Sequence, residues 1–231
     1  MDRFDEHVRW AFAAPVYACA YLAAALVFWW MARRRGFAPD VTAQIMGAGL
    51  LGGLAGANAV QWLATGLPGK TIEGGIAGGW IAVILVKRAL GVTRSTGDLF
   101  ALALPAGEAI GRIACFIGGC CYGKVTTVAW AVHDHEALRH PSQLYLSLAA
   151  AMSFAALYAI ERRMRLPDNA LFYMGGMLFC ASRFTVDSFR DVAATPLGLT
   201  AAQLGCCAGF GFFAWKLVVL LMPRRVTAAA G

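Results

Sequence analysis

Arginine and carboxylate residues occur at helical spacing in two apolar stretches of the sequence. Glu108 and Arg112 are four residues apart. Arg183 and Asp187 repeat that spacing, and Arg190 follows three residues later. Residues three or four apart lie on one face of a helix, and a guanidinium fork suits bidentate binding of a phosphate. The pattern therefore has two interpretations: ion pairs that join helices, or a site for an anionic group.

The composition indicates what kind of protein carries this pattern. Of the 231 residues, 59% are apolar and 14% are charged, against about 45–50% and about 25% in soluble domains. The mean hydropathy is +0.61, and the apolar residues form blocks long enough to cross a bilayer. We therefore expect an all-α, polytopic membrane protein. The formal charge of +7 is interpreted as a topology signal, with no nucleic-acid partner.

Seven segments are long and apolar enough to be transmembrane helices. They are Trp10–Met31, Val41–Thr65, Thr71–Val86, Leu99–Ile117, Pro141–Ile160, Asn169–Asp187 and Thr200–Met222. The second and third contain closely spaced glycines, which are expected to let the helix backbones approach closely. Because the connections are short, we expect a single transmembrane domain covering residues 1–231.

Basic residues cluster after alternate segments and thereby indicate the orientation. Eleven of the 20 Lys and Arg residues fall on one side of the predicted membrane. They are Arg33, Arg34, Arg35, Lys87, Arg88, Arg94, Arg162, Arg163, Arg165, Arg224 and Arg225. Since Lys and Arg are enriched in cytoplasmic loops, the N-terminus is predicted outside and the C-terminus in the cytoplasm.

With this orientation, polar groups from four segments reach one depth. At 1.5 Å per residue, Arg112 and Arg183 each lie about 20 Å above the cytoplasmic starts of their helices. Glu73 and His140 approach the same level from the outer side. A charge within a span costs about 2.5–3.5 kcal/mol on insertion scales, so such residues are candidates for a functional site. We expect an outward-facing site for a phosphodiester, which at this depth means a phospholipid head group.

Several cysteines and histidines allow more than one interpretation. Five of the seven cysteines lie near the predicted outer surface. They are Cys115, Cys120, Cys121, Cys206 and Cys207. Helix packing, a disulfide or redox pair, and a reactive or metal-binding role all remain open for them, because C-x4-C-C is a weak metal pattern. His133 and His135 are interpreted as part of a solvated outer loop, and no metal site is predicted.

Three motifs stand out along the chain: G-R-I-A-C-F-I-G-G-C-C-Y-G ending at Gly123, H-P-S-Q-L-Y from His140 to Tyr145, and R-F-T-V-D-S-F-R from Arg183 to Arg190. Together they resemble motifs of the bacterial prolipoprotein diacylglyceryl transferases. Two further segments, E-G-G-I-A-G-G beginning at Glu73 and V-Y-A-C-A-Y-L around Tyr17, are similar to other family segments, and all occur in family order.

The resemblance implies a seven-helix enzyme of the bacterial inner membrane, with its active site near the outer, periplasmic face. Such enzymes transfer the diacylglyceryl group of phosphatidylglycerol to the lipobox cysteine thiol of a preprolipoprotein and release glycerol phosphate. No cofactor is expected. The resemblance implies catalytic roles for Arg112 and Arg183, with Glu73 or His140 as the general base. The residues expected to bind or position substrate are Tyr17, Glu108, Asp187, Arg190, Gly123 and Tyr145.

The sequence also departs from the family pattern. Glu73 replaces a histidine, Cys115 an asparagine, Cys120 a glutamate, and Leu146 an acidic residue. Two alternatives to diacylglyceryl transfer onto a lipobox cysteine therefore stay open. One is a related phospholipid-dependent transferase with a different protein or small-molecule thiol acceptor. The other is a non-enzymatic binder or transporter of lipids or anions.

Overall fold

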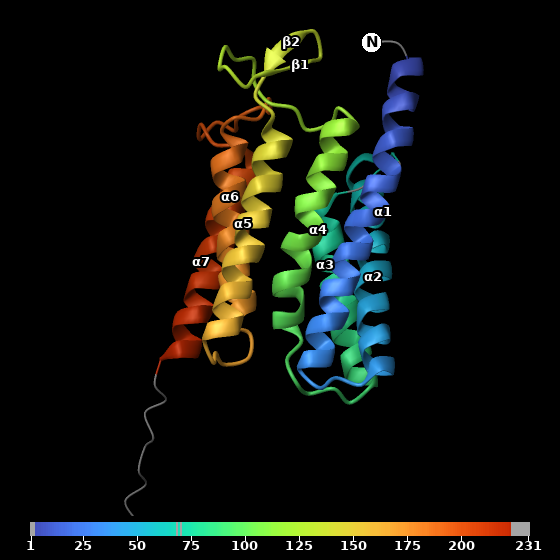
Figure 1. Cartoon of the computed structure of the whole chain (residues 1–231), viewed down its shortest axis with the longest axis vertical. Coiled ribbons are helices and arrows are strands. Elements are labelled where there is room, and N and C mark those ends of the chain that lie inside the picture. Colours follow the sequence, from blue (N-terminus) through green and yellow to red (C-terminus); the bar gives the residue numbers. More distant parts are fainter. Residues whose placement is uncertain (1–2, 68, 70, 223–231) are drawn as a thin grey trace, which may run out of the picture. The chain divides into compact units, whose positions relative to one another are not determined.

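The computed structural model describes residues 3–67, 69 and 71–222, leaving out the side chains of residues 3–7, 64, 72 and 73. Within this part of the chain there are seven helices and one two-stranded hairpin (Figure 1). The helices are α1 (Arg3–Arg34), α2 (Pro39–Thr65), α3 (Ile72–Ala89), α4 (Gly97–Ile117), α5 (Ser142–Arg163), α6 (Ala170–Asp187) and α7 (Ala201–Leu221). The hairpin pairs β1 (Val132–Asp134) with β2 (Ala137–Arg139). The predicted all-helical class is confirmed.

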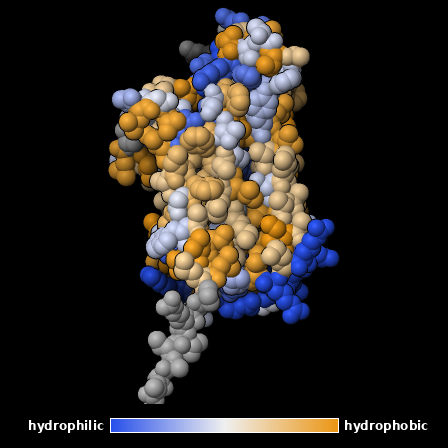
Figure 2. Space-filling view, turned by 90° about the vertical axis from the view of Figure 1, so that its left-hand side faces the viewer, coloured by the Kyte–Doolittle hydropathy of each residue, from blue (hydrophilic) through white to orange (hydrophobic). Residues whose placement is uncertain are grey.

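Five of these helices are long and apolar enough to cross a membrane: α1, α2, α4, α5 and α7. The other two are 18 residues long and carry charged residues toward their C-terminal ends, Lys87 and Arg88 in α3 and Arg183 and Asp187 in α6. Figure 2 shows the resulting pattern on one face, where apolar residues cover the middle of the helices and hydrophilic residues gather toward the ends. The structure therefore supports a multi-pass membrane protein, and the crossing of α3 and α6 stays a prediction.

The chain forms two compact units, of which the first contains Met1–Ala24 and Thr96–Gly231. In this unit α4 packs on α5 and α6, α5 packs on α6, and α6 packs on α7. Because successive helices run in opposite directions, the ends of α4 and α6 and the starts of α5 and α7 lie at one end, beside the hairpin (Figure 1). The fold thus collects the polar ends of four helices.

The second unit contains Ala25–Ser95 and is built around the pair of α2 and α3. The glycine-rich faces of these helices meet directly. A Cβ at Gly56 would collide with the carbonyl oxygen of Gly74, and a Cβ at Gly78 with that of Gly52. The close backbone approach expected from the sequence is confirmed, and it explains why side chains are absent at these positions.

The connection between α4 and α5 contains a hairpin, whereas the sequence analysis treated it only as a loop. His135 and Glu136 occupy its two-residue turn with positive φ angles of 47° and 62°. Two consecutive residues with positive φ are the signature of a type I′ turn, which matches the twist of paired strands. Neither residue is a glycine or an asparagine, so the usual sequence signal for this turn is missing.

Candidate active site

Asp187 is the central buried charge at the polar end of the first unit. Its side chain has no exposed surface. Oδ1 lies 3.5 Å from Arg183 Nη2 and 3.1 Å from Arg190 Nη1. Oδ2 accepts a hydrogen bond from Thr200 Oγ1, and Thr200 forms a reciprocal capping box with Gln203 at the start of α7. One carboxylate therefore fixes two arginines and joins the end of α6 to α7.

Arg112 is held by the preceding turn of its own helix. Its Nε and Nη2 atoms donate to Glu108 Oε1 at 3.3 and 3.1 Å. The side chains are only 12% and 21% exposed, so this pair is shielded from solvent more than an ordinary surface ion pair. The predicted pairings of Glu108 with Arg112 and of Asp187 with Arg183 and Arg190 are thus confirmed.

The three arginines share one electrostatic environment. The positive charges of Arg190 and Arg112 both act on Arg183, together with the negative charge of Asp187. The three arginines carry three positive charges, and Glu108 and Asp187 carry two negative charges, so one positive charge is left over. Such an arrangement of partly buried like charges is unfavourable unless an anion is bound among them.

Two arginine donors in this cluster have no protein partner among the described residues. Arg183 Nη1 and Arg190 Nε are both buried and make no hydrogen bond within that part of the chain. A buried donor without a partner costs about 1–3 kcal/mol. Charge-assisted bonds from arginine to a phosphate or carboxylate would satisfy these atoms. The arrangement can therefore bind an anionic group through groups that are already positioned.

His140 and Tyr145 also come together, at the start of α5. His140 Nδ1 lies 3.1 Å from Tyr145 Oη, which accepts a hydrogen bond from Trp130 Nε1 at 2.7 Å. Both rings contact Phe189, which follows α6. These aromatic rings join the connection between α4 and α5 to the end of α6, next to Arg190.

Gly123 has a packing role at the same place. It forms an isolated β-bridge with Arg190, and a Cβ there would collide with the backbone of His140. The neighbouring Lys124 amide donates to the Phe189 carbonyl at 2.8 Å. Gly123 therefore holds the connection between α4 and α5 against the end of α6, and its contribution to substrate binding stays a prediction.

Tyr17 reaches the site from α1, inside the first unit. Its hydroxyl lies 3.1 Å from Cys115 Sγ, one turn beyond Arg112 on α4. The tyrosine predicted from the sequence thus contacts a cysteine that the sequence analysis left without an assigned role.

Glu73 lies in the first turn of α3, in the second unit. Its side chain is outside the part of the chain that the structure describes. The first turn is capped by Thr71 Oγ1, which accepts a hydrogen bond from the Gly74 amide at 3.2 Å. The proposed role of Glu73 as a general base remains a prediction.

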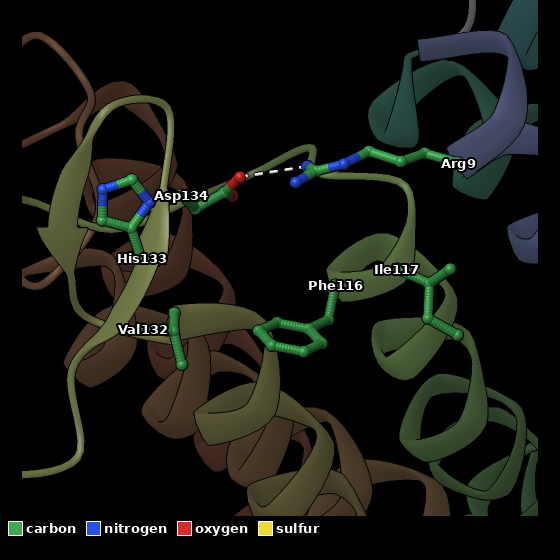
Figure 3. Close-up of a pocket in the computed structure, with 6 residues that line it drawn as sticks. All are labelled: Arg9, Phe116, Ile117, Val132, His133 and Asp134. Carbon is green, nitrogen blue, oxygen red and sulfur yellow. Dashed lines mark hydrogen bonds and ion pairs between the residues drawn. The ribbon is translucent and has the colours of Figure 1, made fainter. Parts of the chain in front are cut away.

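A cavity of about 230 Å³ lies beside the hairpin, outside the arginine cluster. Figure 3 shows Arg9 paired with Asp134 across it, at 3.0 Å, with Phe116 below and His133 at one side. The ion pair joins α1 to the hairpin. His133 is exposed, and His135 is partly exposed with its Nδ1 3.2 Å from Asp134 Oδ1; both lie in the connection between α4 and α5.

Several residues that build the site were missed by the sequence analysis. Thr200 and Gln203 complete the surroundings of Asp187, and the T-x-x-Q pattern of a capping box was the available signal. Ser142 and Gln143 are fully buried and donate to the carbonyls of Cys121 and Cys120. Their place within H-P-S-Q-L-Y was visible, but their partners 21 and 23 residues earlier were not.

Comparisons with known proteins identify related sequences. The family model described as prolipoprotein diacylglyceryl transferase matches residues 7–220. A phosphatidylglycerol–prolipoprotein diacylglyceryl transferase of Geobacter sulfurreducens is 29% identical, over 95% of this chain and 93% of the relative. One of Rhodospirillum rubrum is 33% identical, over 95% of this chain and 91% of the relative. One of Chlorobaculum tepidum is 34% identical, over 66% of this chain and 57% of the relative.

Proposed function

This chain belongs to the prolipoprotein diacylglyceryl transferase family, and we propose that it transfers the diacylglyceryl group of phosphatidylglycerol to a lipobox cysteine. The observation that carries this proposal is the pair of donors on Arg183 and Arg190 that have no partner among the described residues. They lie in a cluster with one net positive charge, which the single negative charge of a phosphodiester would neutralise. Glycerol phosphate is the second product.

The chemistry requires one bond to form as another breaks. The acceptor thiolate attacks the terminal glycerol carbon of the diacylglyceryl group, forming a C–S bond. The C–O bond to the phosphate breaks, and the leaving phosphate takes that electron pair. Its negative charge rises from one to two during this step, so arginines bind the transition state more tightly than the substrate. Arg112, Arg183 and Arg190 would supply this stabilisation.

The acceptor thiol must lose its proton before or during the attack. His140 and Glu73 are the two candidates for that base. The His140 ring lies beside Phe189, directly before Arg190 in the chain, and its Nδ1 contacts Tyr145, so its Nε2 is the nitrogen left for a substrate thiol. Tyr145 would orient the imidazole in this arrangement.

A second feature supports a lipid donor. A groove of about 500 Å³ lies between α5 and α6 and is lined mainly by apolar side chains, among them Leu148, Met152 and Leu178. Tyr145, whose hydroxyl contacts His140, is one of the residues that line this groove. An acyl chain is a suitable occupant of an apolar groove. We propose that the fatty part of the phospholipid lies here, beside the proposed reaction site.

We further propose that α3 and α6 cross the membrane, that residues 1–231 act as one membrane domain, and that the site opens at the outer face of the inner membrane. The basic residues that follow α1, α3 and α5 support this orientation. Alkaline phosphatase fused after Lys124 is expected to be active, and fused after Arg165 inactive. The reverse result would overturn the orientation.

The proposed reaction is tested with purified protein in phosphatidylglycerol nanodiscs and a lipobox peptide. The expected result is a peptide heavier by one diacylglyceryl group, with release of an equal amount of glycerol phosphate. A peptide with serine in place of the lipobox cysteine is the matched control and should stay unmodified. Glycerol phosphate release without peptide modification would show a different acceptor, and no turnover of either kind would contradict transferase activity.

A further inference from the structure

A tryptophan in the connection between α4 and α5 begins a chain of hydrogen bonds that ends on His140. Trp130 Nε1 lies 2.7 Å from Tyr145 Oη, and Tyr145 Oη lies 3.1 Å from His140 Nδ1. The Trp130 ring is mostly exposed, so it contributes little to a buried core. Neither the family resemblance nor the proposed reaction gives this tryptophan a role.

The backbone sets the positions of all three residues. The His140 amide donates to the Lys124 carbonyl at 3.0 Å, which fixes the histidine against the start of the connection. Tyr145 lies in the first turn of α5. Trp130 lies in a turn that is closed by a backbone hydrogen bond of 3.0 Å, two residues before β1 begins. The three side chains therefore meet between anchored segments.

Two aromatic rings limit how the imidazole of His140 can turn. Its ring centroid lies 5.1 Å from that of Phe189 and 6.1 Å from that of Tyr145. Phe189 and Tyr145 also contact each other, with their centroids 5.9 Å apart. Because Nδ1 contacts the tyrosine hydroxyl, Nε2 points away from it. Nε2 makes no hydrogen bond with the residues that the structure describes, and it is available to a substrate.

The direction of each hydrogen bond follows from the chemistry of the groups. An indole N–H only donates, so Tyr145 Oη accepts the bond from Trp130. The tyrosine hydroxyl then has one proton to donate, and His140 Nδ1 is the acceptor that it contacts. If Nδ1 donated instead, the tyrosine proton would have no protein acceptor among the described residues. Donation from Tyr145 to His140 is the arrangement that satisfies all three groups.

This arrangement determines which nitrogen of His140 carries the proton. A neutral imidazole has one N–H donor and one unprotonated nitrogen that accepts. Since Nδ1 accepts from Tyr145, the proton is on Nε2, and the histidine offers a donor to the substrate. A general base at Nε2 would need the opposite tautomer. Of the two candidates for the base in the proposed reaction, this argument leaves Glu73.

We propose that Trp130 is a positioning residue that fixes this tautomer, and that His140 Nε2 donates a hydrogen bond to the leaving phosphate. Hydrogen bonds in a chain polarise one another, so donation from Trp130 strengthens the bond from Tyr145 to His140. No proton is transferred at His140, because the phosphate oxygen takes the C–O electron pair while the Nε2–H bond stays intact. The phosphate gains charge as the C–O bond breaks, so this donor binds the transition state more tightly than the substrate.

The position of His140 suits a phosphate that is held by the arginine cluster. Its ring packs on Phe189, which directly precedes Arg190 in the chain. Gly123 forms a β-bridge with Arg190, and a Cβ on Gly123 would collide with His140. Arg190 Nε is one of the two buried donors without a partner among the described residues. The phosphate as acceptor rests on the proposed function, whereas the tautomer and the role of Trp130 do not.

Nitrogen NMR of the full chain in phosphatidylcholine nanodiscs measures the tautomer without any turnover. The histidines are labelled with ¹⁵N, and the signals of His140 are those that disappear in H140Q. At pH 8.5, where imidazole is neutral, we expect a protonated Nε2 and an unprotonated, hydrogen-bonded Nδ1. Protonated and unprotonated ring nitrogens resonate far apart, so the result is unambiguous. A proton on Nδ1 would overturn the proposal.

The variant W130F tests the tryptophan, because it keeps an aromatic ring and removes the donor. We expect the Nδ1 signal of His140 to move toward that of a nitrogen without a hydrogen bond, since the bond from Tyr145 weakens. W62F is the matched control, because Trp62 and Trp130 are both 63% exposed and Trp62 lies in the second unit. It should leave the signal unchanged. An unmoved Nδ1 signal in W130F would refute the positioning role.

Turnover of H140Q and H140A tests the donor at the phosphate. Glutamine keeps an N–H donor but is no base, and alanine is neither. H140A should lower kcat/KM about 10–100-fold, the effect of one charge-assisted hydrogen bond, and H140Q should keep most of the wild-type value. Equal losses in the two variants would overturn the donor role. A wild-type protein without turnover would contradict the proposed function, and the NMR results would still decide the tautomer and the role of Trp130.

Discussion

Replacing Arg183 with alanine separates the anion-binding role of the arginine cluster from its structural role. Arg183 contributes one ion pair to Asp187, at 3.5 Å. Asp187 also accepts from Arg190 at 3.1 Å and from Thr200 Oγ1. In R183A the buried carboxylate therefore keeps two partners. We expect the free energy of unfolding to fall by about 1 kcal/mol, as for one ordinary hydrogen bond.

The expected loss of activity is much larger than the loss of stability. Arg183 Nη1 has no hydrogen-bond partner among the described residues, and Nη2 makes only the long contact to Asp187. Both atoms are available to a phosphate. Each charge-assisted bond is worth about 1.5–3 kcal/mol, so two bonds correspond to about 10²–10⁴-fold in kcat/KM.

The assay measures glycerol phosphate release and peptide mass in phosphatidylglycerol nanodiscs, together with the unfolding midpoint in detergent. R162A is the matched control, because Arg162 is an exposed arginine in the last turn of α5. It should keep wild-type activity and stability. If R183A retained kcat/KM within about threefold of R162A, at an equal unfolding midpoint, the assignment of Arg183 to phosphate binding would be refuted.

Three other substitutions have definite expected outcomes. D187N should lower the free energy of unfolding by roughly 3 kcal/mol, because two arginines lose their buried counter-charge; an unchanged unfolding midpoint would contradict this. R112K should reduce glycerol phosphate release about 10–100-fold, since an ammonium lacks the planar fork of arginine; wild-type turnover would show that a point charge suffices. G78A should destabilise the chain by about 1–3 kcal/mol through collision with Gly52. G47A, where a Cβ has open space, should not, and equal unfolding midpoints for the two variants would refute the close-packing argument.

The ion pairs of the site could be predicted from the sequence because they are local. Helical spacing alone joins Glu108 to Arg112 and Asp187 to Arg183 and Arg190, and the structure shows these pairs. The glycine contacts of α2 with α3 were predictable for a similar reason, since small residues at regular spacing indicate close helix packing.

The rest of the site depends on contacts between distant segments. The bond from Thr200 to Asp187 joins two helices, and the bond from Tyr17 to Cys115 spans 98 residues. No spacing rule predicts such pairs, because they are set by how whole helices pack. The hairpin was missed for a local reason, since His135 and Glu136 adopt positive φ without the glycine or asparagine that usually indicates it.

Arg183 and Arg190 are proposed to hold the phosphate of the lipid donor, and a structure determined with phosphatidylglycerol bound would show whether they do. Phosphate oxygens are expected within hydrogen-bonding distance, about 2.7–3.0 Å, of Arg183 Nη1 and Arg190 Nε. An acyl chain is expected in the groove between α5 and α6. A bound lipid whose phosphate touches neither of these donors would refute their role in phosphate binding.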